Sequence, residues 1–194
     1  MKLTAKRKLL KKEQIQLSAI RIVNKYGFEQ ATMEQIAAEL NMTKGALYYY
    51  FKNKEDLLYQ CHQLVLSNAL IVLEQIAASE ERAEQKLQAL IHAHINSVID
   101  ERDFFNLMLE PSKAFSTEQL APVLKLRKRY AAIFDEVIAQ GMTEGIFQVE
   151  SPFIARMAIL GGMNWIQQWY KEQGALSRDE IEQHFQQLIR KTLS

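Results

Sequence analysis

The chain has 194 residues, of which 48% are hydrophobic and 24% are charged, with only seven glycines and three prolines. This composition is typical of a globular protein and excludes a disordered or collagen-like chain. Long stretches without glycine or proline favour an all-α protein. The single cysteine, Cys61, excludes an intrachain disulfide and fits a reducing cytoplasm.

A net charge of +1 conceals an asymmetry between two parts of the chain. Residues 1–54 contain 11 basic and 4 acidic side chains, whereas residues 55–194 contain 13 basic and 19 acidic ones. Such a division indicates that the first part meets a polyanion and that the second does something else. The basic N-terminus lacks a following apolar segment, and the most apolar run is interrupted by polar residues. We therefore expect a soluble, cytoplasmic protein without a membrane partner.

The N-terminal segment is strongly basic. Residues 1–12 carry six basic side chains and no acidic one. Two interpretations remain open: a frayed, solvated tail, or a flexible arm that contacts phosphates or the minor groove of DNA. The spacing of apolar residues then predicts a helix from about Glu13 to Tyr26, stopped by Gly27. Phe28 is expected to pack inward.

Two short helices joined by a tight turn are predicted next. Thr32 is suited to cap a helix from Met33 to about Leu40, and Thr43 to cap a helix ending near Phe51. Two such helices form a helix-turn-helix. A plain three-helix bundle without a role in DNA binding is the alternative, and the charge division disfavours it.

The second of these helices has an unusual surface. Its first residues, Thr43 to Ala46, are small or basic, so its backbone can approach another molecule closely. Tyr48 and Tyr49 follow, and their hydroxyls can donate to phosphate oxygens, as can the nearby Lys52 and Lys54 ammonium groups. This is the chemistry of a helix that enters the major groove of DNA.

Two segments, GFEQATMEQIA at residues 27–37 and TKGALYYYFKNKEDL at residues 43–57, resemble the N-terminal signature of the TetR family of bacterial transcriptional regulators. The resemblance covers about residues 10–60. It implies a dimer in which each subunit has a three-helix DNA-binding domain and a larger helical domain for a ligand and the dimer interface. Leu47 and Phe51 would belong to the core. With Lys52 added for its charge, the candidate DNA-contacting residues are Thr32, Thr43, Lys44, Gly45, Ala46, Tyr48, Tyr49, Lys52 and Lys54.

The remaining chain is expected to be helical at about residues 54–79, 83–100, 120–143 and 151–174, and again after Ser177. With the short segment at residues 104–109, this gives about nine helices in all. We therefore predict an all-α protein with a helix-turn-helix domain at 1–54 and a ligand-binding and dimerisation domain at 55–194. Cys61 is better explained as a core residue than as a redox sensor, and His94 is better explained as a core residue than as a ligand contact. Neither a metal site nor a set of catalytic residues is apparent, so no cofactor and no enzyme activity is expected.

A ligand pocket is predicted in the second domain. A nearly all-apolar segment at residues 104–109 precedes a loop, and it fits a pocket wall and ordinary core packing equally well. The basic cluster at residues 125–129 is either a solvated face or a cationic mouth for an anionic group. The candidate ligand-binding residues are Phe104, Phe105, Met108, Phe115, Arg127, Tyr130, Phe134, Trp165 and Trp169.

The last two predicted helices suggest a dimer interface. Two adjacent glycines inside a helix lower its stability, and close approach of another helix or a ligand would offset that cost. The final helix has an apolar stripe that no later segment can cover, so a four-helix bundle across a two-fold axis is expected. The candidate interface residues are Gly161, Gly162, Trp165, Ile181, Phe185 and Leu188.

Residues 161–174 are similar to one subgroup of TetR-like regulators, several of which control lipid, sterol or aromatic-acid breakdown and respond to acyl-CoA thioesters. The sequence thus predicts a ligand-responsive regulator, most simply a repressor, which binds a palindromic operator as a homodimer and is released by a small apolar or acyl-CoA-type effector. Two alternatives remain: an efflux-type regulator that senses apolar cations, and a DNA-binding dimer without a small-molecule ligand.

Overall fold

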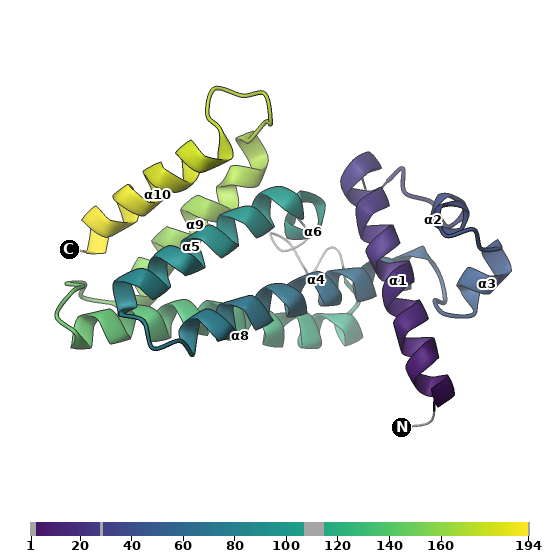
Figure 1. The fold of residues 1–194 in the computed structure, drawn as a ribbon, viewed down its shortest axis with the longest axis horizontal. Helices are drawn as coiled ribbons and strands as arrows, with labels where there is room; N and C mark the ends of the chain where they lie inside the picture. Colours follow the sequence, from purple (N-terminus) through teal and green to yellow (C-terminus); the bar gives the residue numbers. More distant parts are fainter. Residues whose placement is uncertain (1–2, 28, 107–114, 194) are drawn as a thin grey trace.

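The computed structural model describes residues 3–27, 29–106 and 115–193, and these residues form nine helices and no strand. A small N-terminal unit lies at one end of an elongated molecule and a larger helical unit at the other (Figure 1). The all-α prediction is confirmed. Phe28 and Met108 lie outside the described residues.

The N-terminal unit contains α1 (Leu3–Tyr26), α2 (Met33–Glu39) and α3 (Lys44–Tyr48). The predicted start of the first helix at Glu13 is wrong, because α1 is continuous from Leu3. The basic segment is therefore a helical extension rather than a flexible arm. It projects past the rest of the N-terminal unit (Figure 1).

The caps of α2 and α3 follow the sequence prediction. The Thr32 hydroxyl accepts a hydrogen bond from the Gln35 backbone, and the Gln35 side chain accepts one from the Thr32 backbone. The Thr43 hydroxyl accepts one from the Ala46 backbone at 3.2 Å. Between the helices Asn41 takes a left-handed conformation, with φ at 51°, which Asn tolerates better than most residues. This turn sets the angle between α2 and α3.

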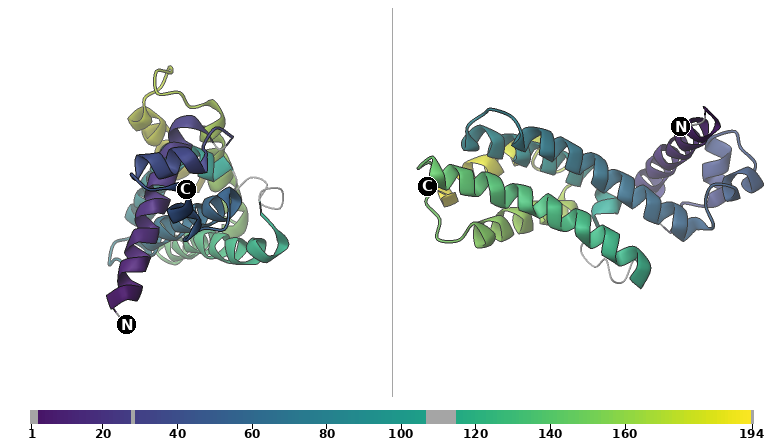
Figure 2. Two further views of the ribbon diagram at one scale, coloured as in Figure 1. Left: turned by 90° about the vertical axis from the view of Figure 1, so that its right-hand side faces the viewer. Right: turned by 90° about the horizontal axis from the view of Figure 1, so that it is seen from below.

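The larger unit contains six helices among the residues that the structure describes. The long α4 leads from the N-terminal unit along the whole body, and α5 and α8 pack against it, while α9 and α10 close the far side (Figures 1 and 2). Their bounds are α4 (Lys54–Ala77), α5 (Ala83–Asp100), α6 (Arg102–Asn106), α8 (Thr117–Thr143), α9 (Pro152–Trp169) and α10 (Arg178–Leu193).

Two hydrophobic cores divide within α4, downstream of the predicted boundary between residues 54 and 55. Leu57 and Cys61 belong to the core of the N-terminal unit, whereas Leu66 begins the core of the larger one. The short α6 also contributes to both cores, since Phe104 packs in the first and Phe105 in the second. The first turns of α4 and one side chain of α6 are therefore part of the N-terminal fold.

The apolar stripe of α10 is largely satisfied within the chain. Ile181, Ile189 and Leu193 are buried in the core of the larger unit, and only Leu188 is strongly exposed. The expectation that this stripe needs a partner subunit is therefore wrong for Ile181.

The end of α8 is fixed by a close contact at Gly141. A Cβ atom there would lie 2.1 Å from the Phe147 ring, so only glycine lets the chain fold back onto the helix. The backbone of Gln148 then donates to the Leu193 carbonyl at 2.7 Å. This contact ties the turn before α9 to the end of α10.

Candidate nucleic-acid interface and internal cavity

The outer surface of α3 is exposed in the way a DNA-contacting helix requires. Tyr48 and Tyr49 are exposed, Tyr49 by 67%, while Leu47 and Phe51 on the opposite side are fully buried. The first turn of α3 carries only small or basic side chains. The helix therefore presents hydroxyl groups and accessible backbone to solvent while its apolar side anchors it.

Lys44, at the first position of α3, is not free in this structure. Its ammonium group forms an ion pair with the Glu34 carboxylate in the first turn of α2, and both side chains are more than half exposed. The contact raises the pKa of Lys44 and lowers that of Glu34 through their hydrogen bond. Lys44 must exchange this carboxylate for a DNA group if it is to contact a base or a phosphate.

The basic part of α1 lies beside α3, which the sequence alone did not indicate. The Lys8 ammonium lies 4.6 Å from the centre of the Tyr49 ring, and the Lys12 ammonium lies 5.6 Å from the centre of the Phe51 ring. One helical turn separates Lys8 from Lys12, so both reach the same neighbour. The positive surface of the N-terminal unit thus includes a helical, rather than a flexible, segment.

The other candidate DNA-contacting residues lie around the same surface. Thr32, Thr43, Gly45 and Lys52 are exposed and Ala46 is half-buried. Lys54 differs, because its ammonium donates to the Glu29 backbone carbonyl at 3.3 Å and so joins the start of α4 to the turn before α2. None of the nine candidates is buried, and Lys54 also has a structural contact.

A small cavity lies in the larger unit between α5, α8 and α9. Its volume is about 210 Å³, below the range of about 300–1,000 Å³ that is usual for drug-sized ligands. Charged and polar side chains share its wall with apolar groups. The lining residues are His94, Arg127, Tyr130, Ala131, Arg156, Met157, Leu160, Gly161 and Asn164.

His94 and Tyr130 form a buried polar pair in this wall. His94 Nδ1 lies 2.8 Å from the Tyr130 hydroxyl, whereas His94 Nε2 has no hydrogen-bond partner among the described residues. Burial lowers the pKa of His94 to about 4, partly opposed by Asn164, so the imidazole is neutral at pH 7. His94 is buried as predicted, but one of its ring nitrogens is left unsatisfied at the cavity.

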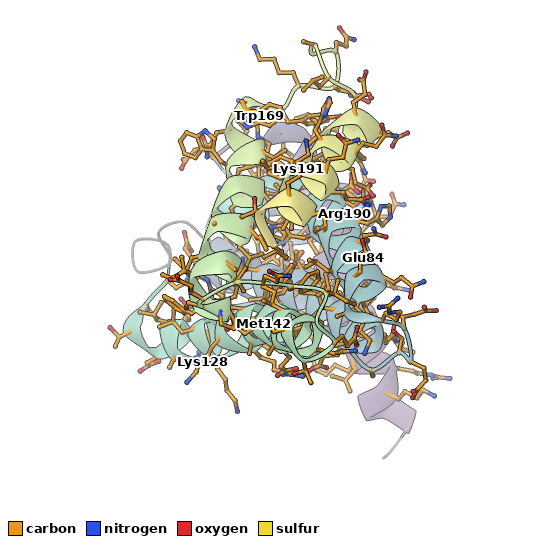
Figure 3. The ribbon with its side chains drawn as sticks, turned by 90° about the vertical axis from the view of Figure 1, so that its left-hand side faces the viewer. Glu84, Lys128, Met142, Trp169, Arg190 and Lys191 are labelled. Atoms are coloured by element: carbon orange, nitrogen blue, oxygen red, sulfur yellow. The ribbon has the colours of Figure 1, made fainter. Side chains whose placement is uncertain are left out.

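The basic cluster on α8 splits between two faces of the helix. Arg129 is exposed and pairs with Glu74 and Glu136, and Lys128 points away from the body (Figure 3). Arg127 is half-buried and lines the cavity, and no ion pair with a carboxylate is found for it among the described residues. Burial lowers the pKa of Arg127. Only one of the four basic residues therefore serves a cavity.

Arg156 is a second cation at the cavity that sequence reasoning missed. Its side chain is 11% exposed, and its Nε donates to Asp135 Oδ1 at 2.8 Å, so its charge is compensated. The signal for it was an arginine within the apolar first half of α9. Asn164, also missed, is polar on the same helix.

The predicted ligand-binding residues are not brought together. Tyr130 and Arg127 line the cavity, while Phe134 and Phe105 pack around His94 from behind it. Phe104 lies in the core of the N-terminal unit. Phe115 packs against the buried His62 ring with the two planes tilted by 42° and the ring centres 4.9 Å apart. Trp165 and Trp169 are exposed on α9, and Trp169 projects outward in Figure 3, so neither tryptophan reaches the cavity.

The candidate interface residues divide in the same way. Gly161, Gly162, Trp165 and Leu188 are exposed, whereas Ile181 is buried within the subunit and Phe185 packs over Gly162. Gly161 also lines the cavity. The exposed face of α9 is markedly apolar for a surface. Its exposed large side chains are Phe153, Ile154, Met157, Trp165 and Trp169.

In the part of the chain that the structure describes, none of the helices is both long and apolar enough to cross a membrane. Within the same residues, His, Cys, Asp and Glu side chains do not gather into a group of three or more that could hold a metal ion.

Comparisons with known proteins agree with this arrangement. A family profile described as "Bacterial regulatory proteins, tetR family" matches residues 17–61, and one described as "Tetracyclin repressor-like, C-terminal domain" matches residues 80–193. The fatty acid metabolism regulator protein of Bacillus subtilis is 24% identical over 140 residues, which are 72% of each chain.

Solved structures have the same fold. A TetR/AcrR-family regulator from Thermobifida fusca superposes with a TM-score of 0.81 at 27% identity, covering 93% of this chain and 96% of the other. AibR, solved in complex with isovaleryl coenzyme A and operator DNA, superposes with a TM-score of 0.73 at 23% identity and covers 91% and 96%. This second likeness concerns the fold alone. Since the C-terminal profile covers more than half of the chain, the protein belongs to the TetR family of DNA-binding transcriptional regulators.

Proposed function

We propose that this regulator represses transcription by binding a palindromic operator as a homodimer, and that a small molecule in the cavity between α5, α8 and α9 releases it. One observation carries the proposal. An exposed recognition helix lies at one end of the chain, and a half-buried cation without a carboxylate partner among the described residues lines a cavity in the other unit. The first feature supports DNA binding, and the second supports a ligand.

On DNA, the first turn of α3 would face base edges while surrounding groups hold the backbone. Gly45 and Ala46 let the helix approach closely, and Tyr48 and Tyr49 can donate to phosphate oxygens. With so little base-reading chemistry in α3, much of the specificity would come from groove shape and from the spacing of two copies.

The dimer would form through α9 with a contribution from α10. So many exposed large apolar side chains on one helix, Trp165 and Trp169 among them, are unusual on a monomer, and Leu188 on α10 is exposed as well. Members of the family bind operator DNA as dimers. A self-complementary patch of this kind suits a two-fold axis.

A physical route leads from the cavity to the DNA-binding unit through α6. His94 lines the cavity, and the Phe105 ring packs edge-on against it with centres 5.9 Å apart. The next residue along the chain towards the N-terminus, Phe104, is buried in the core of the DNA-binding unit. A ligand that moved His94 would therefore shift Phe105 in one core and, through the adjacent Phe104, the packing of the other. A coupling of about 1–3 kcal/mol is enough for regulation.

The cavity narrows the effector class. Apolar cations are disfavoured because Arg127 and Arg156 line it. An acyl-CoA thioester is consistent with AibR, which binds isovaleryl coenzyme A, but the cavity could hold only the acyl part of such a ligand. A regulator without any ligand would leave Arg127, which has no carboxylate partner in the described part of the chain, without an explanation. We therefore propose an effector whose buried part carries an anionic or strongly hydrogen-bond-accepting group.

The test is an operator-binding assay with candidate effectors. Binding sites would be selected from random DNA, and purified protein would be titrated onto the selected site with and without small acids, acyl-CoA thioesters and apolar cations. We expect a palindromic site bound by a dimer and released by one of these classes, with derepression of a reporter in cells. A site bound by a monomer, or transcription activated by the bound protein, would contradict the proposal.

A further inference from the structure

The cavity between α5, α8 and α9 has an unusual charge balance. Arg156 is neutralised by Asp135, and His94 is neutral because it is buried. Arg127 remains as one positive charge, half-buried and without a carboxylate partner among the described residues. A charge removed from water without compensation is costly, and a bound anion would remove that cost. The wall therefore accommodates one negative charge.

A second observation points to a ligand at the same place. His94 is 2% exposed, and its Nε2 atom makes no hydrogen bond of standard geometry among the described residues, although the Asn164 side chain in the same wall also interacts with the imidazole and opposes the lowering of its pKa. When the Tyr130 hydroxyl donates to His94 Nδ1, the imidazole proton lies on Nε2 and is available to an acceptor in the cavity. Buried polar atoms in proteins nearly always have a partner. An unsatisfied one beside an uncompensated arginine indicates that a ligand completes the site.

The remaining wall limits what the ligand can be. Met157, Leu160 and Ala131 provide an apolar side, and the volume is about 210 Å³. A phosphorylated group with two charges would exceed the single positive charge, and a coenzyme moiety would exceed the space. A planar carboxylate matches a guanidinium in a bidentate way and can also accept from an imidazole N–H.

We propose that this cavity binds a small organic carboxylate, whose charge is held by Arg127 with His94 Nε2 as a second donor and whose short apolar body lies against Met157 and Leu160. The assignment rests on the proposed function, because it identifies the effector of the same site. The free acid, rather than its thioester, is the ligand that enters the protein.

The experiment compares each acid with its neutral isostere on the full-length protein. Hexanoate, cyclohexanecarboxylate and benzoate would be titrated calorimetrically, together with the corresponding primary amides and with hexanoyl-CoA and benzoyl-CoA. We expect at least one acid to bind at least about tenfold more tightly than its amide, because the amide lacks the charge-assisted hydrogen bonds.

Two arginine variants on the same helix provide the matched comparison. Arg127→Gln should abolish the preference for the acid, whereas Arg129→Gln should keep it, because Arg129 is exposed and pairs with Glu74 and Glu136. Arg127→Gln should also have a thermal midpoint equal to or above that of the unliganded wild type, since it removes an uncompensated charge. A purely structural Arg127 would instead lower the midpoint. Arg127→Lys, which keeps the charge, should retain part of the affinity.

Several outcomes would overturn the inference. The proposal of a carboxylate ligand would be refuted by equal affinity for acid and amide. It would also be refuted if acid binding survived in Arg127→Gln, or if no acid bound at millimolar concentration. Failure of the proposed function is distinguishable. A thioester that releases operator DNA while no acid binds refutes only the carboxylate. An acid that binds through Arg127 without affecting operator binding keeps the carboxylate site and refutes effector-controlled repression.

Discussion

At the scale of single residues, the DNA-facing surface depends on which partners each polar group already has. Tyr49, which directly follows α3, is 67% exposed, and Lys8 lies over its ring. No hydrogen bond of its hydroxyl is found among the described residues. Lys44, in contrast, is held by Glu34. Lys44 must therefore break an ion pair before it can contact DNA, whereas Tyr49 does not.

Replacing Tyr49 by Phe should weaken binding to operator and to unrelated DNA alike, by about three- to tenfold, because a phosphate contact carries no sequence information. Fluorescence anisotropy with both DNAs at one salt concentration measures this. A loss confined to the operator would assign Tyr49 to base recognition instead.

The ion pair between Lys44 and Glu34 gives a second residue-scale prediction. Glu34→Gln should tighten binding to unrelated DNA and increase the salt dependence by about one phosphate contact, because it removes a carboxylate from the DNA-facing side and frees Lys44. Lys44→Ala is best made in this background, so that no unpaired carboxylate is left behind. There it should weaken operator binding more than non-specific binding. Equal losses would contradict a base-reading role.

At the scale of elements, α9 serves two faces at once. One side lines the cavity through Arg156 and Asn164, and the other exposes Trp165 and Trp169. Gly161 lies between them, and a Cβ atom there would meet nothing within the subunit. A helix-interior glycine costs about 1 kcal/mol relative to alanine, so its presence without an intramolecular reason fits close approach of a second subunit.

Trp165→Asp should therefore dissociate the dimer, since it buries a charge in an apolar interface. Sedimentation equilibrium would report the shift from dimer to monomer. Ile71→Asp is the matched control, because Ile71 is 52% exposed on α4 and Trp165 is 61% exposed on α9. If both variants dissociate the dimer, or if neither does, α9 is not the specific dimer interface.

At the scale of the whole molecule, two buried histidines link stability to pH. Burial lowers the pKa of His62 to about 4, with a further contribution from Arg127, and lowers the pKa of His94 to about 4. An unfolded chain has a histidine pKa near 6.5 and so binds more protons between these values. Stability is complete above pH 6.5 and falls as the pH decreases towards 4.

The expected loss between pH 7 and pH 5 is about 2 kcal/mol of unfolding free energy for each histidine, measured by denaturant titration at both values. His94→Gln should reduce the difference, and His184→Gln, at an exposed site, should leave it unchanged. Glu101 and Asp103, whose pKa values are raised by burial, act in the opposite direction. An unchanged pH profile in His94→Gln would show that this side chain is not buried as a neutral group.

The junction between the two units gives a further prediction at this scale. The Asn24 amide, in the last turn of α1, donates to the Asp100 carbonyl at 3.0 Å and to the Glu101 carboxylate at 2.8 Å, across the end of α5. Asn24→Ala should leave operator affinity and effector affinity within about threefold but reduce the coupling between them by about 0.5–2 kcal/mol.

Gln16→Ala is the control for this junction, because the Gln16 amide makes a similar bond, to the Gln60 carbonyl at 2.9 Å, inside the DNA-binding unit. Operator affinity with and without saturating effector measures the coupling in each variant. An equal reduction in both would indicate general loosening of α1 rather than loss of the contact between the units.

Local sequence determined most of the helices and several of their caps, but not the start of α1. Thr32 and Thr43 cap the helices that they were expected to cap, and Leu47 and Phe51 are buried as the family resemblance implied. These features depend on interactions within a few residues, so the sequence contains them directly. The family signature lies in the same local pattern.

Only the tertiary structure decided which face of each helix packs in a core, which lines a cavity and which is exposed to solvent. Arg127 and Arg129 are indistinguishable in the sequence, yet one lines a cavity and the other pairs at the surface. Phe104 and Phe105 enter different cores. Packing between helices distant in the chain sets these outcomes, because a one-residue step turns a side chain by about 100° around the helix axis. The sequence therefore predicted a DNA-binding helix, whereas the position and charge of the proposed effector site came from the fold.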